Sequence, residues 1–377
     1  MIPRVPLVLL LATIAVGLAR GGHEQPVYPS FYPQEIEIAK IAPQAASDLL
    51  GAGKLHAYIG ADPLPLPASR DAIGFVESLG SFVVVRLNPA SALVADEASA
   101  CAAAGAIVRG MAGLAGAGSM IVHPYPVTPW HGDYLSHVDR AEAERARLLR
   151  VGAPPLPVPP RVRASSELER SLVPQQWLTA GADWDAEIEE MSVAGIVAAS
   201  TVALNGWLGP GAIRAGWFHA YRVIGSASLR EEARTLLARL EAPVHGSSAE
   251  RINLEREFVR LLLAGCRSIV AGYTIKREPF NLQYSAGIEN IAYDALEGLS
   301  SPMFLRTVKL KDFPWNGWLQ LGVATAPDSA WNPINGFTDR FGRLAWYALS
   351  DAAAIPSPYE AAWTLNRISE VEATPRQ

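Results

Sequence analysis

The sequence predicts an α/β N-terminal domain, in which helices flank a mostly parallel sheet, followed by a mainly α-helical C-terminal domain. Residues 34–123 alternate short apolar runs with helical patterns, as α/β layers do. Residues 152–160 (GAPPLPVPP) contain five prolines, which favour an extended linker, and longer helical patterns follow. The expected organisation is an α/β domain over residues 20–151, a proline-rich linker over 152–163, and a mainly helical domain with an aromatic-rich terminal region over 164–377.

Short apolar runs mark the expected strands of the N-terminal part. Residues 35–41 (EIEIAKI) alternate apolar and polar side chains, as a half-buried strand does. Further strands are expected at residues 55–59, 82–87 and 120–123, and helices at 45–50, 70–79 and 96–114, the last capped by Asp96. In open α/β sheets, ligands bind outside the carboxyl ends of the strands. His123 follows such an end and is therefore the first candidate site residue.

The C-terminal half has the longer spacing of helices. A helix is expected before the linker, at residues 133–149, and further helices are expected after it, at 183–204, 229–240, 251–271 and 285–299. Two of them begin with a capping box, at Ser228 with Glu231 and at Ser247 with Glu250. Residues 191–213 carry no charge, and this run is long enough to span a membrane. However, glycine, asparagine and proline residues interrupt it. We favour a buried core helix there over membrane contact.

The first residues indicate export. Arg4 precedes an apolar run over residues 5–18, and Gly17 and Ala19 occupy the small-residue positions of a cleavage site. Residues 1–19 are therefore predicted to be a signal peptide of a periplasmic or extracellular protein. Export permits a disulfide, but Cys101 and Cys266 each lie in an apolar predicted helix. We expect two buried thiols instead.

Charge and motifs exclude several function classes. The net charge of −5 is small for 377 residues and the basic residues are dispersed, so nucleic acid is not an expected partner. The chain has no phosphate-binding loop, no zinc-protease helix and no nucleophile elbow. No catalytic residue is assigned on this basis, and whether the protein is an enzyme stays open.

Coordinating side chains are concentrated in residues 121–140, which hold three of the seven histidines. Asp133 and His137 stand four residues apart, so a helix would place both on one face. His123 and His131 lie just upstream, in a loop stiffened by prolines. The candidate ligands of a divalent transition metal are therefore His123, His131, Asp133 and His137. The alternative is structural: Asp133 caps the helix and the imidazoles pack or pair locally.

Aromatic side chains could contribute to a ligand site. Tyr125, Trp130 and Tyr134 lie among the histidines, and Trp315, Trp318 and Trp331 lie in the irregular terminal region. Indoles on loops can stack on a sugar or surround a cation, although they also fill seams between domains.

The function predicted from these features is that of an exported binding or accessory protein with a ligand site near the domain interface. Its partner would be a small-molecule ligand or another envelope protein. The first alternative is a metal-dependent enzyme that uses His123, His131, Asp133 and His137. The second is a structural subunit of an envelope complex, contacting a partner or the membrane through residues 192–204.

Overall fold

The computed structural model describes residues 33–64, 71–116, 119–150, 152, 154–203, 211–225, 230–241, 247–283, 287–312, 317–331, 337–350, 354–358, 360–365 and 369. The predicted signal peptide, Ser228 of the first capping box and Trp315 lie outside these residues.

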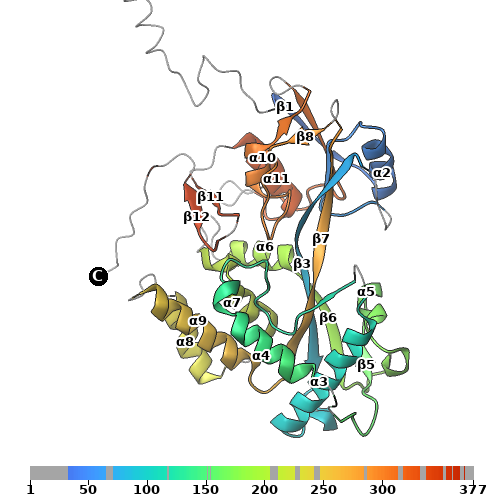
Figure 1. The fold of residues 1–377 in the computed structure, drawn as a ribbon, viewed down its shortest axis with the longest axis vertical. Helices are drawn as coiled ribbons and strands as arrows, with labels where there is room; N and C mark the ends of the chain where they lie inside the picture. Colours follow the sequence, from blue (N-terminus) through green and yellow to red (C-terminus); the bar gives the residue numbers. More distant parts are fainter. Residues whose placement is uncertain are drawn as a thin grey trace, which may run out of the picture.

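Eight strands of the described residues form one mixed sheet. In spatial order they are β1 (Glu35–Lys40), β10 (Trp318–Val323), β2 (Ala57–Ile59), β7 (Ser268–Asn281), β3 (Ile73–Leu87), β6 (Ala186–Ser192) and β5 (Val162–Arg163), with β4 (Ile121–Val122) pairing on β7. The long antiparallel pair β3 and β7 runs along the long axis of the molecule (Figure 1). These two strands join the elements around β1 at one end to those around β6 at the other.

The expectation of a mostly parallel sheet is wrong. The pairs β1 with β10, β10 with β2 and β5 with β6 are parallel, whereas β2 with β7, β3 with β6, β3 with β7 and β4 with β7 are antiparallel. Apolar patterning identifies a strand but not its neighbour. Here β7 and β10, from late in the chain, lie between strands formed early in it.

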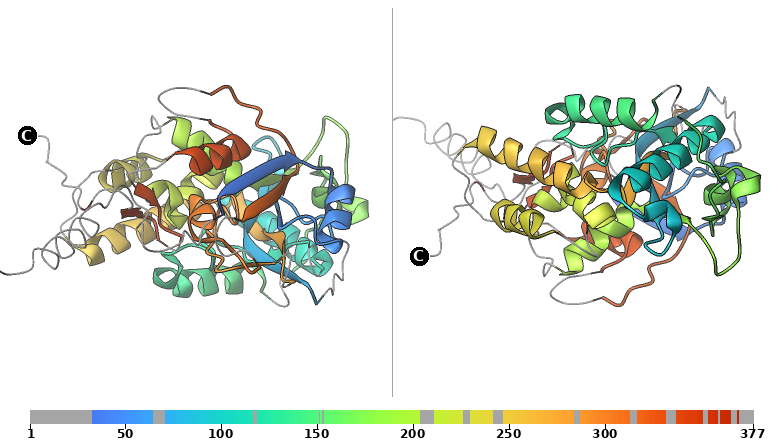
Figure 2. Two further views of the ribbon diagram at one scale, coloured as in Figure 1. Left: turned by 90° about the horizontal axis from the view of Figure 1, so that it is seen from above. Right: turned by 90° about the horizontal axis from the view of Figure 1, so that it is seen from below.

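The larger helices gather in three groups. Near β1 lie α2 (Pro43–Gly51), α10 (Pro302–Thr307) and α11 (Arg340–Leu349); near β6 lie α3 (Glu97–Leu114), α4 (Val138–Leu148) and α5 (Glu167–Ser171); and beside them lie α6 (Val193–Ala203), α7 (Gly216–Ala220), α8 (Glu231–Glu241) and α9 (Ser248–Leu263). From below, α8 in yellow and α9 in gold lie to one side of α3 in cyan (Figure 2).

Short elements connect these groups. They are the single turns η1 (Ala92–Val94), η2 (Tyr134–Ser136), η3 (Gln175–Trp177) and η4 (Gly211–Arg214), the π-turn η5 (Tyr221–Gly225), and the strand pairs β8 (Ile288–Glu289) with β9 (Lys309–Leu310) and β11 (Ala354–Pro356) with β12 (Trp363–Leu365).

The core divides in the same way. One apolar cluster packs α3 against the β6 end of β3 and β7, and another packs α10 and α11 against β1, β2 and β10. A third cluster joins the loop after β4 to α7, α8 and α9 through Tyr125, Trp217 and Phe258. It surrounds the candidate site described below.

Close approach of β4 to β7 depends on Gly272. A Cβ at this position would lie 2.2 Å from the Ile121 carbonyl oxygen. Because glycine has no side chain, Val122 can pair with Gly272, and the His123 amide donates to the Ala271 carbonyl at 3.2 Å. The loop that begins at His123 is therefore anchored directly on the sheet.

Two predicted helices are strands in part or in full. Residues 70–79 were expected to be helical, but β3 begins at Ile73 and pairs with β7 along its length. Residues 183–204 contain β6 and then α6. Buried Ala186 and Ile188 alternate with partly exposed Glu187 and Glu189 at the start of β6, and the pairing of this strand with β3 decides its conformation. Such long-range pairing overrides local helical spacing.

Two other predicted helices also differ. Helix α9 ends at Leu263, because Gly265 and Cys266 adopt positive φ angles of 90° and 53°, and β7 begins at Ser268. The described part of residues 285–299 contains β8 and turns. The C-terminal part thus contributes β6, β7 and β10 to the sheet and is less helical than expected. The division at residues 152–163 stays a prediction, although strands on both sides of it join the sheet.

Cys101 and Cys266 form a disulfide bond, so the expectation of two thiols is wrong. Helix α3 packs on β3 and β7, and the left-handed turn before β7 carries Cys266 to it. The two Cα atoms are 4.9 Å apart, within the normal range for a disulfide.

No helix among the described residues is long and apolar enough to cross a bilayer. The uncharged run contributes α6 and η4, and residues 204–210 lie outside the description.

Candidate metal centre

His123 lies directly after β4, as predicted, and its ring is turned to its own loop. Its Nε2 donates to the Val127 carbonyl at 3.0 Å, and the ring packs against Tyr134 and Tyr273 at centroid distances of 5.9 and 5.7 Å. Burial lowers the pKa of His123 below its ordinary value. These contacts favour a neutral, packed imidazole.

His131 belongs to a chain of buried hydrogen bonds. Its Nδ1 accepts from the Thr128 amide at 2.9 Å, so its Nε2 carries the proton and donates to His219 Nδ1 at 2.9 Å. His219 Nε2 in turn donates to the Ile213 carbonyl at 3.0 Å. Burial lowers the pKa of His131 to about 3 and that of His219 well below 6.5. Both nitrogens of each ring are engaged, which leaves none for a metal in this arrangement.

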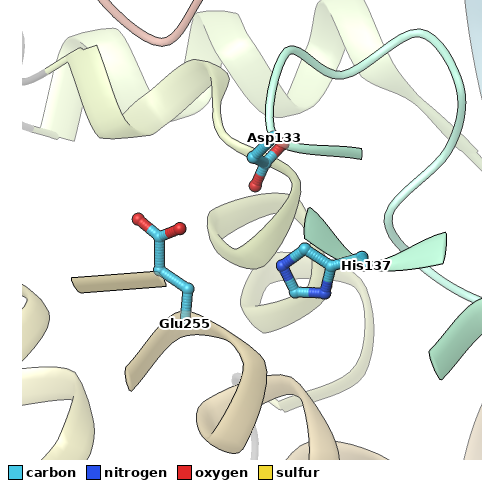
Figure 3. A group of neighbouring side chains, drawn as sticks. All are labelled: Asp133, His137 and Glu255. Atoms are coloured by element: carbon cyan, nitrogen blue, oxygen red, sulfur yellow. The ribbon is translucent and has the colours of Figure 1, made fainter. Parts of the chain in front are cut away.

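Asp133, His137 and Glu255 converge beside this chain. One ligand atom from each residue lies within 4.8 Å of the others. Asp133 precedes η2, His137 precedes α4, and Glu255 comes from α9. In Figure 3 the ring nitrogen of His137 that is farther from the backbone points toward the space between the two carboxylates.

His137 has one nitrogen in use and one without a partner. The side chain is fully buried, its Nδ1 lies 2.8 Å from the Tyr125 hydroxyl, and its Nε2 makes no hydrogen bond to any described residue. Burial lowers the pKa of His137, with the Asp133 charge opposing the shift. The ring is therefore neutral. If Nδ1 donates to Tyr125, the Nε2 lone pair faces the carboxylates, as a metal ligand requires.

The two carboxylates are held by separate elements. Both oxygens of Asp133 accept from the Gly216 amide at 3.0 Å. A Cβ at Gly216 would lie 2.4 Å from a Val127 methyl, so the approach of α7 requires glycine. Glu255 is only 5% exposed and accepts from Arg251 Nε at 2.9 Å. Burial raises the pKa of Glu255, Arg251 opposes this, and the nearby Asp133 adds to it.

One imidazole nitrogen and two carboxylates form a donor set suited to divalent transition metals. Ligand bonds of about 2.0–2.2 Å to a common ion are typical of such sites. Three protein ligands leave coordination positions for water or a further ligand. A divalent cation alone would balance the charge of the two carboxylates.

The structure thus brings together two of the four predicted metal ligands, Asp133 and His137. It leaves His123 and His131 outside the group and adds Glu255, which the sequence analysis missed. A signal for Glu255 exists, because Glu255, Phe258, Val259 and Leu262 share the buried stripe of α9. A carboxylate on such a stripe needs a partner or a cation.

The predicted aromatic ligand residues separate into two places. Tyr125 is buried beside His137, Tyr134 packs on His123, and Trp130 is half-buried near Tyr273. Trp318 is 65% exposed on β10, where it pairs with Glu35 of β1. Strand β1 lies far from α4, α7 and α9 (Figure 1). Trp331 is 49% exposed and contacts Trp346 at a centroid distance of 5.8 Å. Their ligand-binding roles stay predictions.

No family model matches this sequence, and no curated protein shows significant similarity to it. Solved structures resemble it in part. The PBP AgaA of A. tumefaciens R10, solved with agropinic acid, shares 14% identity and a TM-score of 0.41, over 71% of this chain and 59% of AgaA. HbpA2 of Haemophilus parasuis shares 13% identity and a TM-score of 0.42, over 72% and 56% of the two chains.

The oligopeptide-binding protein AppA of Bacillus subtilis, solved with a nonapeptide, gives 12% identity and a TM-score of 0.40, over 71% of this chain and 58% of AppA. The match therefore spans less than three fifths of each of these proteins. The ligands named in these comparisons belong to those proteins.

Proposed function

We propose that this protein is an exported binding protein whose ligand includes a divalent transition-metal ion, held by Asp133, His137 and Glu255. The observation that carries the proposal is the buried Nε2 of His137, which has no hydrogen-bond partner among the residues that the structure describes and faces two carboxylates. Export is supported by the apolar run over residues 5–18.

Energetics favour a cation over an empty cluster. A buried polar atom without a partner costs about 1–3 kcal/mol, and two carboxylates within 4.8 Å repel each other. A bound cation removes both penalties at once. Binding would also displace any proton on Glu255, whose pKa is raised, so metal affinity should increase with pH.

The direct test is metal binding by the purified protein after chelator treatment and dialysis. We expect calorimetry with Zn²⁺, Ni²⁺, Co²⁺ and Mn²⁺ to show one site per chain for at least one ion. His137→Ala and Glu255→Gln should each weaken binding about tenfold or more. Glu257→Gln is the matched control, because Glu257 lies on the same helix with its side chain 44% exposed.

Absence of stoichiometric binding for all four ions would contradict the proposal, as would wild-type affinity in His137→Ala. Because His137 is buried, circular dichroism of each variant is needed to show that it folds. Glu255→Gln preserves shape and serves as the second, milder variant.

The open coordination positions also favour a second candidate, a metal-dependent enzyme with a metal-bound water as the reactive group. The metal-loaded protein would then turn over ester or phosphoester test substrates, and His137→Ala would abolish the turnover. That result would support the enzyme over a binding protein.

A further inference from the structure

A second binding feature lies next to the metal centre. A cavity of about 360 Å³ opens between α4, α9 and the Cys101–Cys266 disulfide. Its charged lining consists of Arg140, Arg147, Arg256, Arg260, Glu97 and Glu144. Four guanidinium groups thus face two carboxylates, and the lining has an excess of positive charge.

Three of these arginines are held in place by carboxylates. Arg147 pairs with Glu144; Arg256 pairs with Asp139 at 2.6 Å, and Arg260 with Glu257 at 2.7 Å. Asp139 and Glu257 lie outside the cavity lining. A guanidinium has five N–H donors, and each of the three arginines keeps at least two beyond its described contacts.

Arg140 differs from the other three. It is exposed and makes no ion pair within the described part of the chain. Its guanidinium is therefore available to an incoming ligand without breaking a protein contact.

The rest of the lining suits the body of an organic molecule. Ala143, Leu263, Ala264 and the disulfide supply apolar lining, and the buried Tyr125 also lines the cavity. Apolar walls with a few convergent polar groups, at this volume, are the usual composition of small-ligand sites. Arginine is the side chain that best matches the paired oxygens of carboxylate and phosphate groups.

We propose that this cavity binds a small organic anion through carboxylate or phosphate groups, with Arg140 and Arg260 as the main contacts. Tyr125 lines the cavity and also hydrogen-bonds His137, so the anion and the metal centre share one side chain. This site is additional to the metal site, and the anion would bind whether or not a metal is present.

The test measures anion binding by metal-free protein from which the chelator has been dialysed away. Probes for calorimetry are succinate, citrate and inorganic phosphate, with glycerol and 1,4-diaminobutane as neutral and cationic controls. We expect at least one anion to bind and neither control to do so, with affinity falling as ionic strength rises. Succinate against phosphate separates the two kinds of head group.

The double variant Arg140→Gln/Arg260→Gln should bind the anion about tenfold or more weakly. Arg239→Gln is the matched control, because Arg239 is similarly exposed and pairs with Glu250 outside the cavity. Failure of all three anions to bind, or unchanged affinity in the double variant, would overturn the inference. Because no metal is present, neither outcome bears on the metal site.

Discussion

At the scale of single residues, the site depends on which nitrogen of each buried imidazole is already engaged. His131 and His219 use both of theirs, whereas His137 uses only Nδ1. The distinction was not visible in the sequence, where His131 lies two residues and His137 four residues from Asp133. It follows from contacts with Thr128 and Ile213, which only the fold supplies.

Tyr125 should act on metal affinity without touching the metal. Its hydroxyl holds Nδ1 of His137, and partners of this kind fix the tautomer and orientation of a ligand imidazole. We expect Tyr125→Phe to weaken metal binding about 10–100-fold while the stoichiometry stays at one. Titration with Co²⁺, followed by visible absorption, would measure the change.

Tyr134→Phe provides the control, because Tyr134 lies in the same loop and its hydroxyl makes no hydrogen bond in the described part of the chain. Equal affinities for the Tyr125→Phe variant and the wild type would show that the hydroxyl has no positioning role.

His219 should remain neutral in the folded protein well below pH 6.5. Burial lowers its pKa, so the unfolded chain binds a proton below pH 6.5 that the folded chain does not. The imidazole therefore costs no stability above pH 6.5. As the pH falls below that value, the free energy of unfolding should decrease, by about 1.4 kcal/mol per pH unit at most for this group. Imidazole proton shifts against pH would report the titration, and a midpoint near 6.5 for His219 in folded protein would refute the expectation.

At the scale of elements, the sequence predictions were correct where a local signal, such as a helix cap or an apolar alternation, decides the structure. Asp96 caps α3 by accepting from the Ser99 amide at 2.7 Å, and Ser247 caps α9 by accepting from Glu250 at 3.1 Å. The alternation at residues 35–41 likewise corresponds to β1. The helix predictions for residues 70–79 and 183–204 were wrong, because pairing with β7 and with β3 decides the conformation of these segments.

The candidate site shows the same division. Four-residue spacing predicted the proximity of Asp133 and His137, and this is confirmed although η2 replaces the expected first turn of the helix. Glu255, more than a hundred residues later, could not be paired with them from sequence spacing alone. Only the packing of α9 against α7 brings it there.

The disulfide between α3 and the start of β7 should contribute substantially to stability. It closes a loop of 165 residues, for which the loss of chain entropy on unfolding is worth roughly 2–5 kcal/mol. Reduced protein should unfold at a lower urea concentration than oxidised protein. Two titratable thiols in non-reduced, denatured protein would show instead that the bond does not form.

At the scale of the whole molecule, early and late segments of the chain contribute to one sheet. Strand β1 pairs with β10, and β2 lies between β10 and β7. The separation into an early α/β part and a later helical part could not foresee this, because apolar patterns do not specify which strands become neighbours. Helices α4, α7 and α9, which lie around the candidate metal centre, are at the other end of β3 and β7 from these strands (Figure 1).

The interleaved sheet has a consequence for the order in which the molecule can assemble. Glu35 in β1 pairs with Trp318 in β10, so that edge of the sheet cannot form until most of the chain has been synthesised. Contacts of such sequence separation slow folding. Asp133, His137 and Glu255 are all available earlier, once α9 has emerged. A chain that emerges gradually therefore has all three candidate metal ligands before the last strands of the sheet arrive.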